Sequence, residues 1–120
     1  MPDEPCAGQM QPGPALDALV AREVRGWVTH PRNNHMWCSV SDDGNYVLER
    51  DAKDWFPSTD IRAAMEVAEK FFVYLFHKQG PSRYDATVGD LDALHSATTP
   101  TLPHAICLAS LKAKENGDVE

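Results

Sequence analysis

Two histidines and a cysteine lie close together in the first third of the chain, at His30, His35 and Cys38. Imidazole nitrogens and thiolates are preferred ligands of Zn²⁺. The spacing is not that of a zinc finger or a zinc ribbon, and no Cys-x-x-Cys pair accompanies it. We therefore expect no metal site, and we interpret these residues as loop and core positions.

Serines and paired carboxylates offer the other candidates for catalysis. Ser58 and Ser96 could act as nucleophiles, but neither lies in a Gly-x-Ser-x-Gly elbow. Asp90 and Asp92 could act as general acid and base, yet they occupy a short polar segment that predicts solvation. The sequence also lacks a glycine-rich phosphate loop and a dinucleotide fingerprint. We expect a protein that is not an enzyme and that has no cofactor.

Acidic residues dominate the charge, since 18 Asp and Glu against 11 Lys and Arg give −7. Residues 40–60 and residues 85–120 each contain six acids and two bases, a net charge of −4, whereas residues 61–84 carry +2. This balance argues against direct binding of nucleic acid, which needs a basic face. The acidic segments either attract a basic partner or only keep the protein soluble. The candidate partner-binding residues are Asp42, Asp43, Asp85, Asp90 and Asp92.

Length and composition predict one globular domain. The chain has 120 residues, of which 42% are hydrophobic. No apolar run reaches the roughly 20 residues that cross a bilayer, and the acidic, proline-rich N-terminus is unlike a signal peptide. Cys6, Cys38 and Cys107 are too far apart in the sequence for a disulfide framework. We expect a cytoplasmic protein without a membrane partner, in which Cys38 and Cys107 fill the core.

Apolar spacing and turn residues predict the elements. Residues 1–14 form an extended Pro/Gly-rich arm, which a neighbouring subunit could order. A helix spans Leu16 to Trp27, with Gly26 as its stop. A polar turn at 29–34 precedes a hairpin of strands 36–40 and 46–49 around Asp43-Gly44. A second helix covers 59–70, capped by Ser58 or Thr59. Strands at 71–77 and 83–88 form another hairpin, residues 90–101 a loop, and residues 103–114 a third helix.

The order helix, hairpin, helix, hairpin, helix predicts an α+β fold with a four-stranded antiparallel sheet covered by helices. Residues 15–115 form a single α+β sandwich domain, and residues 116–120 an acidic tail. We expect the aromatic residues Trp27, Trp37, Trp55 and Phe71–Phe76 in the core. An open alternative places some of them at a dimer face or stacked on a base, with Arg62 and Arg83 holding phosphates.

Four pieces of this pattern resemble the phage α-β-α (ABA) sandwich domain family. They are the opening helix at 16–24 with Gly26-Trp27, the Pro57-Ser58-Thr59-Asp60-Ile61 turn, the helix at 64–70, and the closing helix at 103–113. Together they frame residues 16–113. Thr101-Leu102-Pro103-His104 departs from the usual Thr-Ala-Pro-Leu of the family. The resemblance implies a small phage accessory protein and its fold, but no settled activity.

These observations lead to the hypothesis of a phage or prophage protein that binds a host protein stoichiometrically in the host cytoplasm. The favoured target is a nucleic-acid-binding component of host defence, blocked in the manner of an anti-CRISPR inhibitor by acidic residues in its basic groove. One alternative is a small-ligand binder that sequesters a nucleotide signal in a pocket at a subunit interface. Another is a structural accessory protein. A homodimer is also an open possibility.

Overall fold

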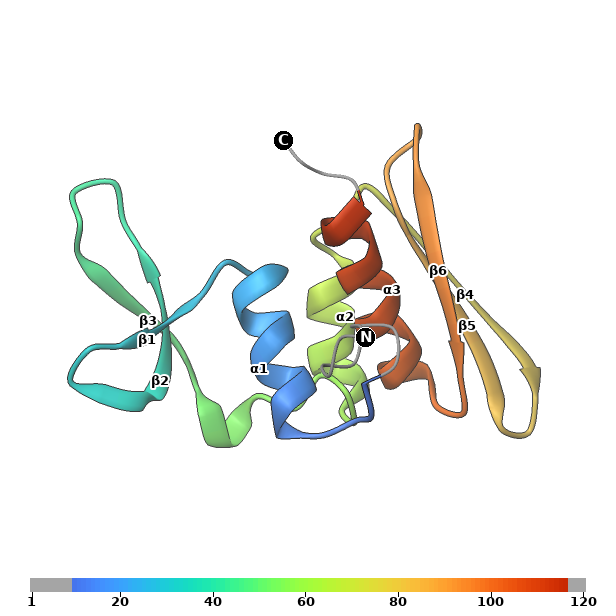
Figure 1. Ribbon diagram of the computed structural model, residues 1–120, viewed down its shortest axis with the longest axis horizontal. Coiled ribbons are helices and arrows are strands. Elements are labelled where there is room, and N and C mark those ends of the chain that lie inside the picture. Colours follow the sequence, from blue (N-terminus) through green and yellow to red (C-terminus); the bar gives the residue numbers. More distant parts are fainter. Residues whose placement is uncertain (1–9, 117–120) are drawn as a thin grey trace, which may run out of the picture.

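The computed structural model describes residues 10–116, so most of the expected arm at 1–14 and of the tail at 116–120 lies outside the described residues. Three α-helices, six strands and one 3₁₀ helix follow one another along this part of the chain (Figure 1). Their order is α1 (Pro14–Glu23), β1 (Val28–His30), β2 (Asn33–Val40), β3 (Tyr46–Asp51), η2 (Ala52–Asp54), α2 (Ile61–Ala68), β4 (Val73–Gly80), β5 (Arg83–Gly89), β6 (Leu94–Thr99) and α3 (Leu102–Asn116).

The strands form two separate antiparallel sheets, so the expected single four-stranded sheet is wrong. The N-terminal sheet has the order β1-β2-β3 and the C-terminal sheet the order β4-β5-β6. Both predicted hairpins exist, but each gains a strand that we had placed in a turn or loop. β1 has only 3 residues and β6 reads Leu-His-Ser-Ala-Thr-Thr, so neither shows clear apolar alternation. The helices lie between the two sheets and keep the hairpins apart (Figure 1).

Helix α3 is the centre of the core. It packs against β5 and β6 on one side and against α2 and α1 on the other. Every residue from His104 to Leu111 is therefore buried. Small residues allow this close packing, because α2 presents Ala63, Ala64 and Ala68, and α3 contributes Ala105 and Ala109, all of them buried.

Two helix ends differ from the expectation in an informative way. The first helix ends at Glu23, and the chain then turns at Gly26, whose φ of 73° suits glycine. Helix α2 is capped by Asp60, whose carboxylate accepts the Arg62 N–H at 3.0 Å. The predicted cap at Ser58 or Thr59 is wrong, because the Ser58 side chain is fully buried and its hydroxyl instead accepts the Gly13 N–H at 2.9 Å.

A buried carboxylate connects this loop to the first helix. Asp17 on α1 is only 4% exposed, and its Oδ1 accepts the Ser58 backbone N–H at 2.8 Å. The Asp17 carbonyl oxygen accepts the indole N–H of Trp55 at 2.9 Å. Burial raises the pKa of the Asp17 carboxyl above its ordinary value of 3.8, and the hydrogen bonds from Ser58 offset part of that rise. Residues 55–58 are thus fixed to the start of α1.

Two tryptophans join the N-terminal sheet to the helices. The rings of Trp27 and Trp55 lie 4.7 Å apart between centroids, at an angle of 59°. The Arg25 guanidinium lies 4.7 Å from the Trp27 ring, and that of Arg50 lies 5.4 Å from the Trp55 ring. Glu66 on α2 binds both arginines, through its carboxylate to Arg50 at 2.8 Å and its carbonyl oxygen to Arg25 at 3.3 Å. The expected core position of the tryptophans is confirmed, but that of Phe71–Phe76 is wrong for Phe72 and Tyr74, which are 75% and 38% exposed.

We predict that Asp17→Ala lowers the free energy of unfolding by about 1–3 kcal/mol, because the buried Ser58 N–H loses its acceptor. Asp17→Asn keeps an acceptor and costs less. The pKa of Asp17 is higher in the folded state than in the unfolded state, so protonated Asp17 favours folding. This contribution to the stability of the wild type is complete below pH 3.8 and is lost as the pH rises through the folded-state pKa. The stability of Asp17→Asn relative to wild type should therefore increase over that range and then level off. Urea unfolding at a series of pH values measures this difference, and a difference that is independent of pH would contradict it.

We predict that Trp27→Ala destabilises the protein by about 3–5 kcal/mol through the loss of a buried aromatic contact. Amides of β2 and β3 should lose protection from hydrogen exchange more than amides of α3, because the Trp27–Trp55 contact that attaches this sheet to the helices is lost. Tyr46→Ala is the control, since Tyr46 is 46% exposed on the same sheet, and it should cost about 1 kcal/mol or less. If α3 and the N-terminal sheet of Trp27→Ala lost protection equally, the Trp27 contact would not stabilise that sheet in particular, and the prediction would be wrong.

Candidate interaction surface

The five candidate aspartates occupy three places. Asp42 and Asp43 lie in the turn between β2 and β3, and Asp90 and Asp92 lie in the turn between β5 and β6. Asp85 lies within β5. Four of them thus form two pairs of sequence neighbours, which we call the N-terminal acidic turn (residues 41–45) and the C-terminal acidic turn (residues 89–93), and Asp85 lies apart.

The N-terminal acidic turn is held by its own polar groups. The Gly44 N–H donates to the Ser41 carbonyl oxygen at 2.9 Å. Asp43 accepts from the Ser41 hydroxyl and from the Asn45 N–H, and these bonds lower its pKa below the ordinary value. The Asp42 side chain is exposed and makes no hydrogen bond or ion pair with a described residue. The turn thus holds one carboxylate firmly ionised and leaves its neighbour available.

The C-terminal acidic turn follows the same design. Asp90 accepts the backbone N–H groups of Asp92 and Ala93, both at 3.0 Å. Gly89 precedes it with φ 152°, and a Cβ there would lie 2.1 Å from the Ala93 carbonyl oxygen, so only glycine fits. The Asp92 side chain is exposed and without a partner among residues 10–116. Each turn therefore uses one aspartate for its own shape and presents the other to solvent.

Asp85 is engaged on the face of the C-terminal sheet opposite α3. Its neighbour Ala86 is fully buried, and alternation along the strand puts Asp85 on the other face. There the carboxylate accepts from the Thr98 hydroxyl at 2.6 Å and from the Gln79 amide, and His77 Nδ1 lies 3.9 Å away. These contacts leave Asp85 less available to a partner than the turn aspartates.

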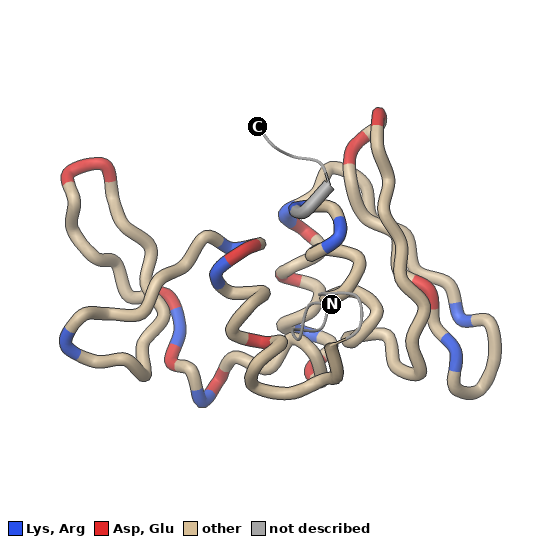
Figure 2. The backbone as a smooth tube through the Cα atoms, in the orientation of Figure 1, with Lys and Arg blue, Asp and Glu red and all other residues tan. Residues whose placement is uncertain are grey.

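The two acidic turns project on the same side of the molecule. Figure 2 shows both turns at the upper edge, toward opposite ends of the long axis, and that axis is 44 Å long. The basic residues at the end of α3 lie between them, so the edge is not uniformly acidic. Charges act over about 8 Å at physiological salt, a small part of that length. The turns are therefore two separate acidic sites that face one direction.

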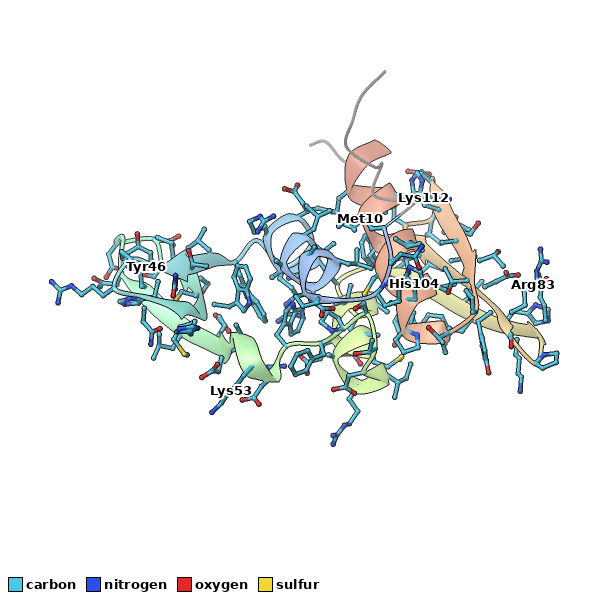
Figure 3. All side chains as sticks on the ribbon, turned by 60° about the horizontal axis from the view of Figure 1, so that its bottom comes forward. Met10, Tyr46, Lys53, Arg83, His104 and Lys112 are labelled. Carbon is cyan, nitrogen blue, oxygen red and sulfur yellow. The ribbon has the colours of Figure 1, made fainter. Side chains whose placement is uncertain are left out.

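Exposed apolar side chains lie next to the N-terminal acidic turn. Val40 is paired with Tyr46, and Cys38 with Leu48, on the face of the sheet opposite that of the buried Trp37. Val40, Tyr46 and Leu48 are 52%, 46% and 61% exposed. Tyr46 lies at the end of the molecule away from the C-terminal sheet (Figure 3). The sequence analysis did not predict this exposed apolar face. The run Tyr46-Val47-Leu48 could have indicated it, because three apolar residues in a row are unusual in a strand with one solvated face.

The residues considered for metal and thiol chemistry are otherwise engaged. His30 accepts the Arg32 N–H at 3.0 Å, and its ring lies 5.5 Å from that of Tyr46. Cys38 and Cys107 are buried, as expected. Burial, and to a lesser extent the nearby Asp17 charge, raises the pKa of the Cys107 thiol well above its ordinary value. Within the described residues, no group of three His, Cys, Asp or Glu is placed to hold a metal ion.

The groups proposed for a nucleotide are not brought together. Arg62 is at the start of α2, and Arg83 begins β5 at the far end of the C-terminal sheet (Figure 3). Each lines a different cavity. Arg62 lines one of about 480 Å³ with Arg50 and Phe56, and Arg83 lines another of about 320 Å³. A third cavity, of about 190 Å³, is lined among others by Lys70, Phe71 and His95. No helix within residues 10–116 is long and apolar enough to cross a membrane.

Known proteins share this architecture. A crystal structure of a phage protein from Bacillus cereus ATCC 14579 is similar over 99% of this chain and 100% of that chain, with a TM-score of 0.60 and 18% sequence identity. That identity shows a shared fold alone. No curated protein matches the chain. The profile of the Phage ABA sandwich domain matches residues 18–111, which is most of the chain and includes α2, both sheets and the first ten residues of α3. The chain therefore belongs to the phage ABA sandwich domain family.

Proposed function

We propose that this protein, encoded by a phage or prophage, binds a host protein stoichiometrically and blocks its basic surface without catalysis. The observation that carries this proposal is the placement of two acidic turns on the same side of the molecule (Figure 2). A partner with two basic sites, or with one long basic groove, can contact both turns at once. Nucleic-acid-binding components of host defence have such grooves, and occupation by carboxylates excludes the nucleic acid.

Electrostatics and apolar contact have different roles in this proposal. Exposed carboxylates contribute little affinity each, but they accelerate association with a basic surface. Affinity then comes from apolar side chains that lose water in the complex. Val40, Tyr46 and Leu48 supply such side chains directly beside the N-terminal acidic turn. This turn is therefore the primary contact, and the C-terminal acidic turn is the second.

Affinity capture from the host with the tagged protein supplies the partner, and the purified pair is then titrated at several salt concentrations. We predict that Asp42→Asn with Asp43→Asn slows association, weakens binding by about two- to fivefold per charge, and reduces the dependence on salt. Asparagine keeps the acceptor that Asp43 provides to the turn, so the hairpin retains its shape. Asp90→Asn with Asp92→Asn should act in the same direction.

Asp85→Asn is the matched control. It removes one charge where each double variant removes two, so effects are compared per charge, and it removes that charge from a carboxylate that is already bonded to Thr98 and Gln79 on the outer face of the C-terminal sheet. We expect a smaller effect on the association rate. Salt dependence that is the same in wild type and in both double variants would refute binding through the acidic turns. Turnover of any substrate by the purified protein would refute the non-catalytic mechanism.

A further inference from the structure

The two sheets present four edge strands, and three of them carry features that prevent pairing with another strand. β1 has 3 residues, which is too short for a stable ladder. β3 has a register shift at Trp37/Cys38 and carries the charged residues Glu49, Arg50 and Asp51. β6 is polar, and α3 packs across it. These are the usual protections of an exposed sheet edge.

β4 lacks these protections from Val73 to His77, and only its last part carries a charge, Lys78, and a register shift, between Lys78 and Gly80. It has 8 residues, pairs with β5 on one side only, and shares its first four residues with an uncharged run, Phe71-Phe72-Val73-Tyr74-Leu75-Phe76. Helix α3 packs across β5 and β6, so β4 extends beyond the helix layer. Phe72, Tyr74 and Leu75 are accordingly 75%, 38% and 61% exposed. An uncharged edge of high β-propensity favours the addition of another strand.

We propose that the free edge of β4 binds β4 of a second copy of this chain in antiparallel orientation. Three strands from each copy then form one continuous sheet. Among the described residues no strand occupies this edge, so its outward N–H and C=O groups are available for a ladder. An antiparallel pair of identical strands is related by a two-fold axis, which closes the assembly at a dimer.

The side chains of β4 are complementary to themselves in this orientation. When Leu75 lies opposite Leu75 of the second copy, Tyr74 lies opposite Phe76, and each Lys78 lies opposite Phe72, the residue just before β4. No like charges meet, and the two lysines stay at opposite ends of the interface. Aromatic pairs and a lysine over an aromatic ring are favourable contacts across neighbouring strands. This self-complementarity identifies a second copy as the occupant, rather than a strand of another protein.

Sedimentation velocity of the purified chain, from micromolar to millimolar concentration, tests the proposal. We expect a concentration-dependent change from monomer to dimer and no larger species. Leu75→Lys should abolish the dimer, because two lysines would then lie opposite each other. Leu94→Lys is the matched control, since Leu94 is 51% exposed on the other edge strand of the same sheet, and it should leave the dimer intact. Circular dichroism of both variants checks that they keep the fold.

Three results would overturn the proposal. The first is a wild-type chain that remains monomeric at millimolar concentration. The second is a dimer that persists in folded Leu75→Lys, and the third is open-ended association. A chain that is monomeric alone, but whose β4 amides become protected by a host protein, would assign this edge to another occupant. The acidic turns are unchanged in Leu75→Lys, so this test is independent of the proposed function.

Discussion

The fold depends on one buried carboxylate, because Asp17 connects segments that are 38 and 41 residues apart in the sequence. Its side chain binds the Ser58 N–H and its carbonyl oxygen binds the Trp55 indole, so α1 fixes the loop between β3 and α2. That loop positions the N-terminal sheet, because its Trp55 packs on Trp27, which directly precedes β1. A buried carboxylate is costly unless hydrogen bonds satisfy it, and the raised pKa of Asp17 reflects the uncompensated part of that cost. The carboxylate therefore specifies geometry more than it adds stability.

The two sheets have different relations to the core. The C-terminal sheet covers α3 with β5 and β6, so Ala86 and Val88 are fully buried. The N-terminal sheet reaches the core mainly through Trp37 and the Trp27–Trp55 pair. It therefore retains exposed apolar side chains that a sheet packed over a helix layer would bury. Large exposed apolar surfaces on small proteins usually have a partner, and the acidic turn beside this one favours a basic partner.

The sequence predicted those elements whose signals are local. Asp43-Gly44 placed the first hairpin turn, the spacing of buried residues placed the helices, and the three tryptophans were correctly assigned to the core. β6 was not predicted because its buried positions are Ala97 and Thr99, which give only a weak apolar pattern. Its pairing with β5 also depends on the tertiary structure, which local sequence does not reveal. The Ser58 cap failed for a related reason. The Ser58 hydroxyl accepts a hydrogen bond from the N–H of Gly13, 45 residues earlier, and local sequence patterns do not predict that bond. The pairing of the aspartates is also local, since Asp42 is next to Asp43 and Asp90 is two residues from Asp92, but only the fold places the two turns on one side of the molecule.

The acidic turns and the β4 edge impose opposite demands on charge. Two copies that each carry a net charge of −7 repel each other, so a dimer can form only through a segment that adds no further like-charge contacts. The uncharged run from Phe71 to Phe76 is such a segment, although the C-terminal acidic turn lies beside its start, where Val73 pairs with Gly89 and Phe72 and Asp90 line one cavity. Salt screens the repulsion between copies and also the attraction between acidic turns and a basic partner. Rising ionic strength should therefore favour the dimer while it weakens the complex. Charge placement would in this way make the proposed self-association and the proposed partner binding respond oppositely to salt.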